Sequence, residues 1–259
     1  MPRNPLLLTF GVWRALLLRE IIPRLFQHRT SWLWLVVEPV FHVVFIAFIF
    51  TGLRVRSVGG VDMVAWIMMG LMAFFVFSRT AVQAKNAIHM SRALYAYRQV
   101  LPIDSVIARG VLEFVLMTLI AVLLFSVAIM FEFVRLPADP LLLMFAWFGL
   151  WLLGMGYGLI SSVATELATE FGNLFQLVIT PLYFISGVFL PISAIPKPYR
   201  DILLLNPISH GLEAARLGFV PHYHVVPELD LIYVYGFALT MVFVGLLLQL
   251  RFAQKVRAL

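Results

Sequence analysis

The chain has 259 residues, of which 62% are hydrophobic and 12% are charged, whereas soluble domains are about half apolar and about a quarter charged. This composition excludes an ordinary soluble fold, and the absence of cysteine excludes disulfides, thiolate catalysis and cysteine-based metal sites. The net charge of +6 does not indicate nucleic-acid binding, because the basic residues stand at the ends of apolar blocks rather than together on one polar segment.

The first segment, Leu6–Arg29, predicts a helix that lies in the membrane interface, with charges along much of one side and a candidate bend at Pro23. No cleavable signal peptide is expected, because Arg14, Arg19 and Glu20 interrupt the apolar region. A charged flank that only orients the first span is the alternative. The apolar stripe recurs every three or four positions, at Gly11, Ala15, Leu18, Ile22 and Leu25.

Six charge-poor blocks follow, each near the roughly 20 residues that a helix needs to cross a bilayer core of about 30 Å. They predict an all-α membrane protein with six transmembrane helices. We expect one transmembrane domain over residues 1–259, with the interface helix in residues 1–30 and the six-span bundle in residues 31–259. The blocks are Trp32–Leu53, Met63–Val82, Arg109–Phe131, Leu141–Val163, Asn173–Leu190 and Leu231–Leu250.

The distribution of Lys and Arg predicts that both termini are cytoplasmic. Thirteen of these residues lie in segments on the same side as the termini, and six lie in the loops opposite. Basic residues concentrate in cytoplasmic loops, and an even number of spans also places both termini on one side.

The loop Lys85–Ile103 predicts a short cytoplasmic helix that docks a partner. Lys85, His89 and Arg92 fall on one helical face, and Pro102 is expected to stop the helix. The alternative is a solvated connector, since a charged face usually contacts only water. The apolar and aromatic residues of the loop are Ile88, Leu94, Tyr95 and Tyr97.

The segment Pro181–Arg216 predicts irregular backbone at membrane depth, because its prolines cannot donate hydrogen bonds and Gly187 adds a flexible point. Such backbone is tolerated where protein or a water-filled cavity satisfies it, so we expect the segment to line a pathway. Ile202–Leu205 and Leu212–Leu217 are candidate short re-entrant or interfacial helices, and a plain outer loop is the alternative. The prolines are Pro181, Pro191, Pro196, Pro198 and Pro207.

Ionisable residues at the first and third spans are candidate site residues, because a charge in a membrane helix is costly and normally faces the bundle interior. Glu38 and His42 lie four residues apart on one face. Glu38 either forms a structural ion pair or acts at the channel mouth. Arg109 and Glu113 have the same spacing and predict a local salt bridge.

Two further polar groups stand outside the spans. Glu166 and Glu170 lie in a connection without basic residues, where they either contact a partner protein or solvate a tight turn. His222 and His224 have no acidic or cysteine neighbours that would complete a metal site, so no metal is expected.

Catalytic motifs are missing from the chain. It has no GxSxG elbow, no HExxH pair and no GxxxxGK[ST] phosphate loop. An enzyme is therefore disfavoured, and an ATP-driven function requires a second subunit.

Short motifs follow one another along nearly the full length of the chain. They are LLLRE (Leu16–Glu20), WLWLVVEPVFH (Trp32–His42), PID and IARGVLE within Pro102–Glu113, and PLYFISGVFLP, IPKPYR and NPISHGLEAAR between Pro181 and Arg216. In this order and spacing the chain resembles the membrane permeases of capsular polysaccharide ABC exporters, the KpsM-type branch of the ABC-2 permeases.

The resemblance implies the ABC-2 exporter fold and a homodimer in the bacterial inner membrane, bound on its cytoplasmic side to two copies of a nucleotide-binding ATPase subunit. ATP and Mg²⁺ would bind to that ATPase, and this chain would hold no cofactor and catalyse no reaction. The substrate would be a long, usually acidic polysaccharide with a phospholipid-linked end. In related exporters a periplasmic adaptor and an outer-membrane channel continue the route.

The resemblance also implies roles for individual segments. The N-terminal helix would be an interface helix, the loop after the second span a coupling helix, and the region after Pro181 an outer gate with short periplasmic helices. The residues expected to couple to the ATPase are Lys85, His89, Arg92, Leu94, Tyr95, Tyr97, Glu166 and Glu170.

A sliding glycan is expected to make weak contacts with aromatic faces and hydroxyl groups. The usual role of such aromatic residues, as interfacial anchors or lipid-facing side chains, is the alternative. Candidate channel or gate residues are Trp32, Trp34, Glu38, His42, Tyr183, Phe184, Ser186 and Phe189, and Arg14, Lys85 and Arg92 are candidates for anionic groups at the inner mouth.

Three other functions remain open from the sequence. A sister ABC-2 permease for O-antigen or teichoic acid would share nearly every feature. A proton-coupled secondary transporter would use Glu38 and His42. An intramembrane enzyme would need a catalytic constellation that the motifs do not supply.

Overall fold

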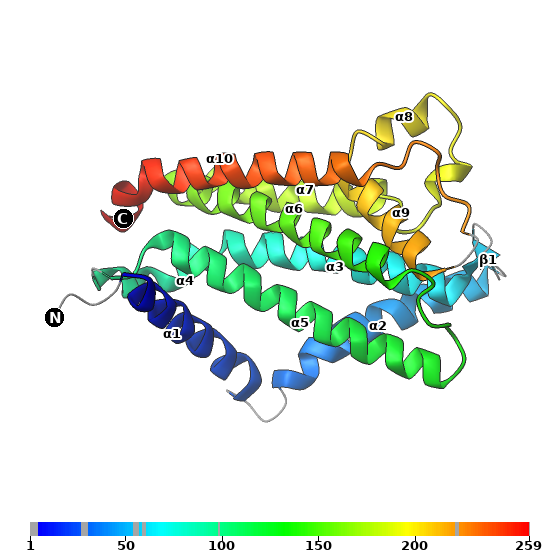
Figure 1. Ribbon diagram of the computed structural model, residues 1–259, viewed down its shortest axis with the longest axis horizontal. Coiled ribbons are helices and arrows are strands. Elements are labelled where there is room, and N and C mark those ends of the chain that lie inside the picture. Colours follow the sequence, from blue (N-terminus) through cyan, green and yellow to red (C-terminus); the bar gives the residue numbers. More distant parts are fainter. Residues whose placement is uncertain are drawn as a thin grey trace.

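The protein is an elongated helical bundle. The computed structural model describes residues 5–26, 31–53, 57–58, 61–97, 99–220 and 223–258. The start of helix α1 (Pro5–Phe26) and the end of helix α10 (Leu231–Ala258) lie at one end of the long axis (Figure 1). Near the other end lie helices α8 (Tyr199–Leu203) and α9 (Pro207–Phe219) and the hairpin of β1 (Ser57–Val58) and β2 (Val61–Asp62). We call these the terminal end and the distal end.

Helices make up most of the chain, with one short hairpin near the distal end. In chain order, the elements are α1 (Pro5–Phe26), α2 (Ser31–Gly52), β1 (Ser57–Val58), β2 (Val61–Asp62), α3 (Met63–Lys85), α4 (Ala87–Ser91), the 3-10 helix η1 (Arg92–Ala96), α5 (Pro102–Met130), α6 (Pro140–Leu167), α7 (Thr169–Ile185), the 3-10 helix η2 (Ile192–Ala194), α8 (Tyr199–Leu203), α9 (Pro207–Phe219) and α10 (Leu231–Ala258).

Five of the described helices are long and apolar enough to cross a membrane: α2, α3, α5, α6 and α10. They cover five of the six predicted blocks. The remaining block, the fifth in chain order, lies largely on α7, which has 17 residues and contains Pro181. The helical membrane fold is confirmed, and the count of six spans stays a prediction.

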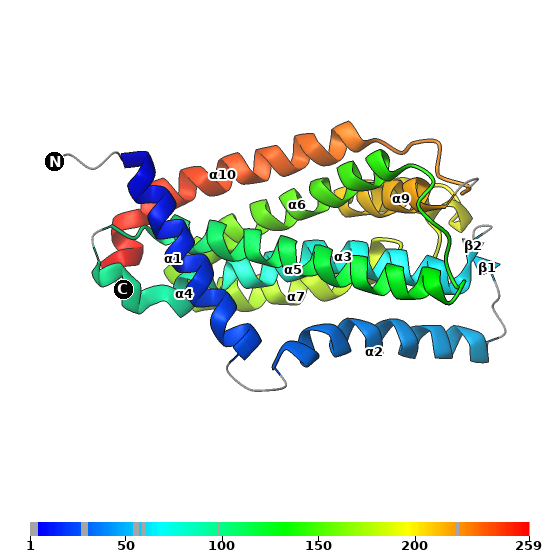
Figure 2. The same cartoon turned by 60° about the horizontal axis from the view of Figure 1, so that its bottom comes forward.

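Helix α3 forms the centre of the bundle and α2 lies at its edge (Figure 2). In the apolar stretch of α3, 83% of the residues are buried, against 11% in α2. Asp62 begins α3, because its carboxylate accepts a hydrogen bond from the backbone N–H of Val64 at 2.9 Å. The large side chains of Trp66 and Leu71 are fully buried on α3.

Glycines on α6 allow it to pack closely between α3 and α10. A Cβ atom at Gly158 would lie 2.3 Å from the Cβ of Ala84 on α3, and one at Gly156 would lie 2.7 Å from the Cβ of Met241 on α10. Membrane helices gain little from hydrophobic burial against each other and depend on such close backbone approach. The sequence GMGYG therefore fixes α6 in the middle of three helices.

The fifth predicted block ends earlier than expected. The sequence predicted a helix to Leu190, but α7 ends at Ile185. Gly187 adopts φ +78°, the left-handed region that glycine enters without strain, and so turns the chain out of the helix. The segment that follows runs through η2 and α8 to α9. Helix α9 contains the predicted Leu212–Leu217, whereas α8 ends at Leu203 and shares only two residues with the predicted Ile202–Leu205.

Helix α1 lies obliquely across the terminal end, over α5 (Figure 2). It packs with Leu16, which is buried, and with the half-buried Trp13. The predicted apolar stripe faces away from the bundle, since Leu18 and Ile22 are about half exposed. This orientation leaves the stripe free to contact a bilayer, as the predicted interface helix requires.

Candidate functional site

The loop between α3 and α5 forms a compact polar site at the terminal end. Its chain passes from α4 directly into η1, which ends at Ala96 and is capped by Tyr97, whose N–H bonds to the carbonyl of Leu94. The sequence predicted that Pro102 would stop a helix, but Pro102 is instead the first residue of α5. A proline fits the first turn, where its missing N–H has no helical partner, and Asp104 accepts the N–H of Leu101 at 2.9 Å.

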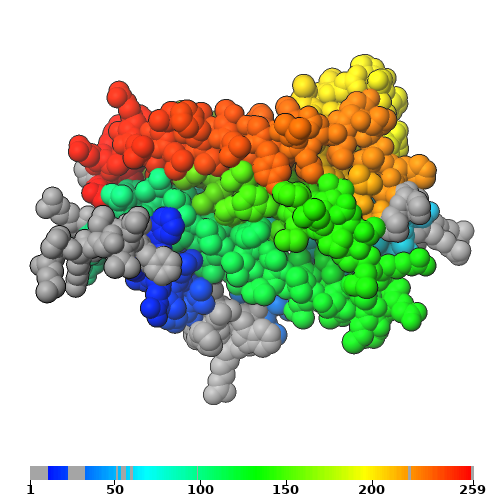
Figure 3. Space-filling model, in the orientation of Figure 1, coloured from blue at the N-terminus to red at the C-terminus, as the bar shows by residue number. Residues whose placement is uncertain are grey.

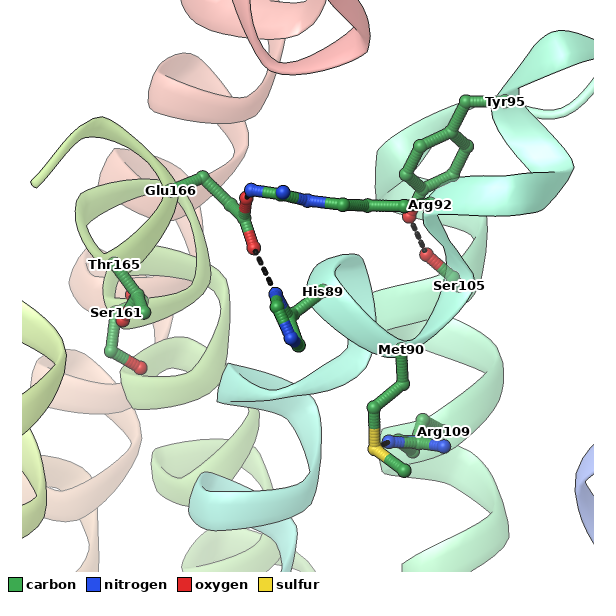
Figure 4. A network of polar contacts seen from close by, with 9 residues as sticks. All are labelled: His89, Met90, Arg92, Tyr95, Ser105, Arg109, Ser161, Thr165 and Glu166. Atoms are coloured by element: carbon green, nitrogen blue, oxygen red, sulfur yellow. Dashed lines mark hydrogen bonds and ion pairs between the residues drawn. The ribbon is translucent and has the colours of Figure 1, made fainter. Parts of the chain in front are cut away.

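Glu166, near the end of α6, holds two basic residues of this loop (Figure 4). Arg92 of η1 donates to its Oε2 atom, and Nδ1 of His89 on α4 lies 3.9 Å from Oε1. The Glu166 side chain is 3% exposed, whereas those of Arg92 and His89 are 43% and 71% exposed. A buried carboxylate thus anchors a cationic surface that remains open to a partner.

Tyr95 attaches the same loop to α5. Its hydroxyl lies 2.6 Å from Oγ of Ser105, which in turn donates to the carbonyl of Pro102 at 2.7 Å. Burial raises the pKa of Tyr95 to about 12, and the hydrogen bond with Ser105 opposes that shift. Tyr95 therefore stays protonated at neutral pH and can act as a donor.

Lys85 does not share a face with His89 and Arg92. The chain turns at Asn86 between α3 and α4, so a single helical phase does not extend across this position. Lys85 is buried and donates to the carbonyl of Gly172 at 3.2 Å and to Oε1 of Gln176 at 3.0 Å. It joins α3 to α7 rather than presenting a charge to a partner.

The remaining predicted coupling residues lie around this site. Leu94 is half-buried and Tyr97 is exposed at the end of η1. Glu170 is exposed in the first turn of α7 and lies outside the ion pairs of Glu166. Arg14 is exposed on α1.

Helix α1 is tied to the same end by polar contacts that the sequence did not predict. Arg109 on α5 donates to Oε2 of Glu20 through Nε at 3.1 Å, and the two side chains are 4% and 13% exposed. Trp13 donates to Oδ1 of Asp104 at 2.8 Å. The sequence predicted a local Arg109–Glu113 salt bridge, and the ion pair that the structure adds joins Arg109 to Glu20 on α1.

Helices α2, α3 and α7 meet through the predicted channel residues. Glu38 on α2 forms an ion pair with Arg79 on α3, which favours the structural interpretation of Glu38. His42 lies 3.2 Å from the hydroxyl of Tyr183 on α7, with its ring edge-on to Phe75. The two ionisable residues of the first span thus have separate partners.

The other predicted lining residues differ in exposure. Trp34 and Phe184 are exposed, and the Tyr183 ring contacts Phe184 and Phe189. Ser186 is fully buried and accepts a hydrogen bond from Asn206 at 2.8 Å, which speaks against it as a lining residue. The side chain of Trp32 lies outside the described residues, although its backbone belongs to α2.

A buried ionic cluster at the distal end was not predicted from the sequence. Arg216 on α9 lies 3.3 Å from Glu213, donates to the carbonyl of Gly187 at 2.8 Å, and stacks 3.5 Å from the centre of the Trp66 ring. The Tyr223 hydroxyl donates to Glu213 at 2.7 Å. An acid and a base spaced i, i+3 in an otherwise apolar segment were the available signal.

A metal centre is not indicated. Within the described ranges no group of three or more His, Asp or Glu residues could hold a metal ion. His222 of the HYH sequence lies outside the described residues.

Comparison with known proteins relates this arrangement to a family. Residues 11–220 match the family model described as ABC-2 type transporter. The chain is 34% identical to the polysialic acid transport protein KpsM of Escherichia coli over 90% of both chains. It is 27% identical to the capsule polysaccharide export inner-membrane protein BexB of Haemophilus influenzae over 80% of this chain and 78% of that one. It is 26% identical to the corresponding protein CtrC of Neisseria meningitidis serogroup A, over 83% and 81%.

Proposed function

The chain belongs to the ABC-2 type transporter family, and from this membership we propose that it is the membrane-spanning subunit of an ATP-driven exporter of capsular polysaccharide. The observation that carries the proposal is its similarity, over 80% to 90% of its length, to proteins named for polysialic acid transport and capsule polysaccharide export. The substrate is a lipid-linked, acidic glycan that moves from the cytoplasm to the periplasm across the inner membrane.

The terminal end is the cytoplasmic end in this proposal. Thirteen Lys and Arg residues lie in the segments on that side, against six opposite, and basic loops are retained in the cytoplasm. Two copies of an ATPase subunit bind there and hold the ATP and Mg²⁺, because this sequence has no phosphate loop.

The coupling element is α4 with η1. Arg92 and Tyr97 are exposed there, while Glu166 and Ser105 hold the loop against α6 and α5. Movement of an ATPase surface against this loop is passed to α6 through the Glu166 pair and to α5 through Tyr95. Both helices run toward the distal end (Figure 1).

The glycan passes between two copies of the chain. Helix α2 buries little of its surface within one copy, and exposed apolar residues continue onto α7. Phe41, Phe45 and Phe48 are exposed on α2, and Leu174 and Leu177 on α7. These surfaces border the pathway in a homodimer, and a periplasmic adaptor and an outer-membrane channel continue the route.

The test replaces the loop residues and measures assembly and export together. In Arg92→Ala and Tyr95→Ala variants, we expect co-purification of the ATPase subunit and surface polysaccharide to fall together, because the loop loses its attachment to α6 and α5. Arg135→Ala is the matched control, since Arg135 is an exposed arginine near the distal end. Its ATPase co-purification should equal that of the unmodified chain.

Two results would count against the proposal. Unchanged ATPase binding and export in the double variant Arg92→Ala/Tyr95→Ala would show that this loop is not the coupling element. Flux that follows a proton gradient in the purified chain without an ATPase would instead favour a secondary transporter.

A further inference from the structure

An apolar cavity of about 710 Å³ opens between α5 and α6. This volume falls within the range of roughly 300–1,000 Å³ typical of ligand pockets. Met69 of α3 and Phe219 of α9 contribute to its lining, as do Phe114 of α5 and Trp147 of α6. Four helices therefore contribute to the walls of the cavity. Helices α5 and α6 run across the face shown in Figure 3.

The cavity suits a hydrocarbon rather than a polar ligand. None of its sixteen lining residues is charged. The Thr118 hydroxyl is already engaged, because it donates to the carbonyl of Phe114 at 2.7 Å and accepts from Nε1 of Trp147 at 2.9 Å. A sugar or nucleotide placed here would lose its hydrogen bonds to water without replacement.

The position of the cavity places it in the distal half of the membrane. Its lining extends along α5 to Ile129, next to the end of that helix, and begins on α6 at Leu141, in its first turn. Val122 and Met144 line the cavity and are themselves exposed, so it opens sideways to the bilayer. Acyl chains are the molecules that a bilayer presents at this depth.

The loop at the distal end of the cavity carries two opposite charges. Pro137 lines the cavity, and the loop that carries it also carries the exposed Arg135 and Glu132. Glu132 adopts φ 60° and is held there by the helix end, where the N–H of Phe133 bonds to the carbonyl of Ala128 at 2.9 Å. A non-glycine residue in this conformation is uncommon and is often functional.

From the cavity and this loop we infer a binding site for a zwitterionic phospholipid, phosphatidylethanolamine, from the distal leaflet. One acyl chain fills the space between α5 and α6. Arg135 binds the phosphate group, and Glu132 binds the ammonium group. The bound lipid holds α5 and α6 together where the protein leaves a gap, and this role does not depend on what the exporter carries.

The test fills the cavity and counts bound lipid. Ser126→Phe places a ring in the groove from an exposed position on α5, so the protein core is not disturbed. Leu123→Phe is the matched control, since Leu123 is exposed on the same helix but does not line the cavity. Native mass spectrometry of the delipidated full-length chain is recorded with added dioleoyl-phosphatidylethanolamine or dioleoyl-phosphatidylglycerol.

We expect one retained phosphatidylethanolamine in the unmodified chain and in Leu123→Phe. Ser126→Phe should weaken its binding about tenfold, which corresponds to the loss of about two buried methylene groups. Arg135→Gln should weaken both lipids, because both carry a phosphate. Glu132→Gln should weaken phosphatidylethanolamine alone, because only that lipid carries an ammonium group.

Three outcomes overturn the inference. Equal binding in Ser126→Phe and Leu123→Phe would place the lipid elsewhere. A change in oligomeric state instead of lipid binding would assign the groove to a second copy of the chain. Retention of an adduct only when the chain is produced together with glycan synthesis would assign it to the lipid end of the substrate.

Discussion

Two ion pairs at opposite ends of the bundle differ in how far the protein encloses them. At the distal end, Glu213 and Arg216 are completely enclosed, with Trp66, Tyr223 and the carbonyl of Gly187 as their partners. At the terminal end, Glu166 is enclosed but its partner Arg92 is nearly half exposed.

This difference indicates which end can move. An enclosed ion pair is stable only with all its partners in place, since loss of one leaves a buried charge uncompensated. A half-exposed pair can exchange a partner for water or for another protein at small cost. We therefore expect the distal cluster to act as a rigid anchor for α9 and the terminal loop to act as the adjustable contact.

Removal of Arg216 is the strongest test of the distal anchor. Arg216→Leu leaves Glu213 charged and buried and leaves the carbonyls of Gly187 and Val188 without their donor, so it should lower the free energy of unfolding by about 3–5 kcal/mol. Thermal unfolding in nanodiscs measures the effect, with Arg251→Leu at an exposed position of α10 as the control. Equal melting temperatures for the two variants would show that the cluster does not anchor α9.

A smaller loss of stability is expected when a methyl group is added at Gly70, next to the Arg216 side chain. A Cβ atom at Gly70 would lie 2.3 Å from Nη2 of Arg216 and 3.0 Å from the carbonyl oxygen of Val188. Gly70→Ala should therefore destabilise the protein by about 1–3 kcal/mol, as overpacking usually does. Gly236→Ala is the control, because a Cβ there meets no atom within 4 Å. Equal stability of the two variants would mean that Arg216 can move aside freely.

The terminal end should respond less to loss of one charge. Arg92→Gln keeps a hydrogen-bond donor for Glu166 but removes the positive charge of a side chain that is 43% exposed, so we expect a loss of about 1 kcal/mol in the free energy of unfolding. The Arg109–Glu20 pair at the same end is more enclosed. Exchange of the two charges tests whether the Glu20–Arg109 pair holds α1. Glu20→Arg should make α1 accessible to proteases, and the double variant Glu20→Arg/Arg109→Glu should restore protection. If the double variant is cleaved as fast as the single one, the pair does not hold α1.

The same comparison explains what the sequence could predict. The apolar spans and the irregular backbone around Gly187 depend on local composition and on proline and glycine chemistry, which are readable along the chain. The position at which α7 ends was predicted five residues too late. The partners of charged residues depend on packing between distant segments. Arg109 pairs with Glu20, 89 positions away on α1, and helical spacing along α5 gives no indication of that partner.

Helical spacing also gave a wrong prediction for the basic residues of the terminal site, for a second reason. It places Lys85 with His89 and Arg92 only if one helix continues through Asn86, and the chain turns there. The sequence did not predict the distal cluster, because two charged residues, Glu213 and Arg216, in a predicted outer segment suggest solvent exposure. Burial of Arg216 follows from the space left at Gly70, which no pattern in the α9 sequence reveals.

The smallest expected effect concerns an exposed charge cluster at the distal end, beside the anchor. Glu228 lies 3.1 Å from Arg200 and 3.5 Å from Lys197. A hydrogen bond from its own backbone lowers the pKa of this carboxyl, and Arg200 and Lys197 add to that shift. Because the folded pKa lies below the unfolded one, the stabilisation is present at neutral pH and is lost as the pH falls through the folded pKa.

Hydrogen exchange of the backbone around Glu228, measured from pH 7 downward with correction for intrinsic rates, tests this expectation. Protection should decrease slightly only in the acidic range below the usual carboxyl pKa, and Glu228→Gln should remove that acid-dependent part while leaving the α9 amides unchanged. The anchor of Arg216 should keep its protection over the same range, because it is held by Glu213, Tyr223 and two backbone carbonyls rather than by the exposed cluster. Simultaneous loss of protection in α9 and around Glu228 would mean that the exposed cluster and the enclosed anchor unfold as one unit.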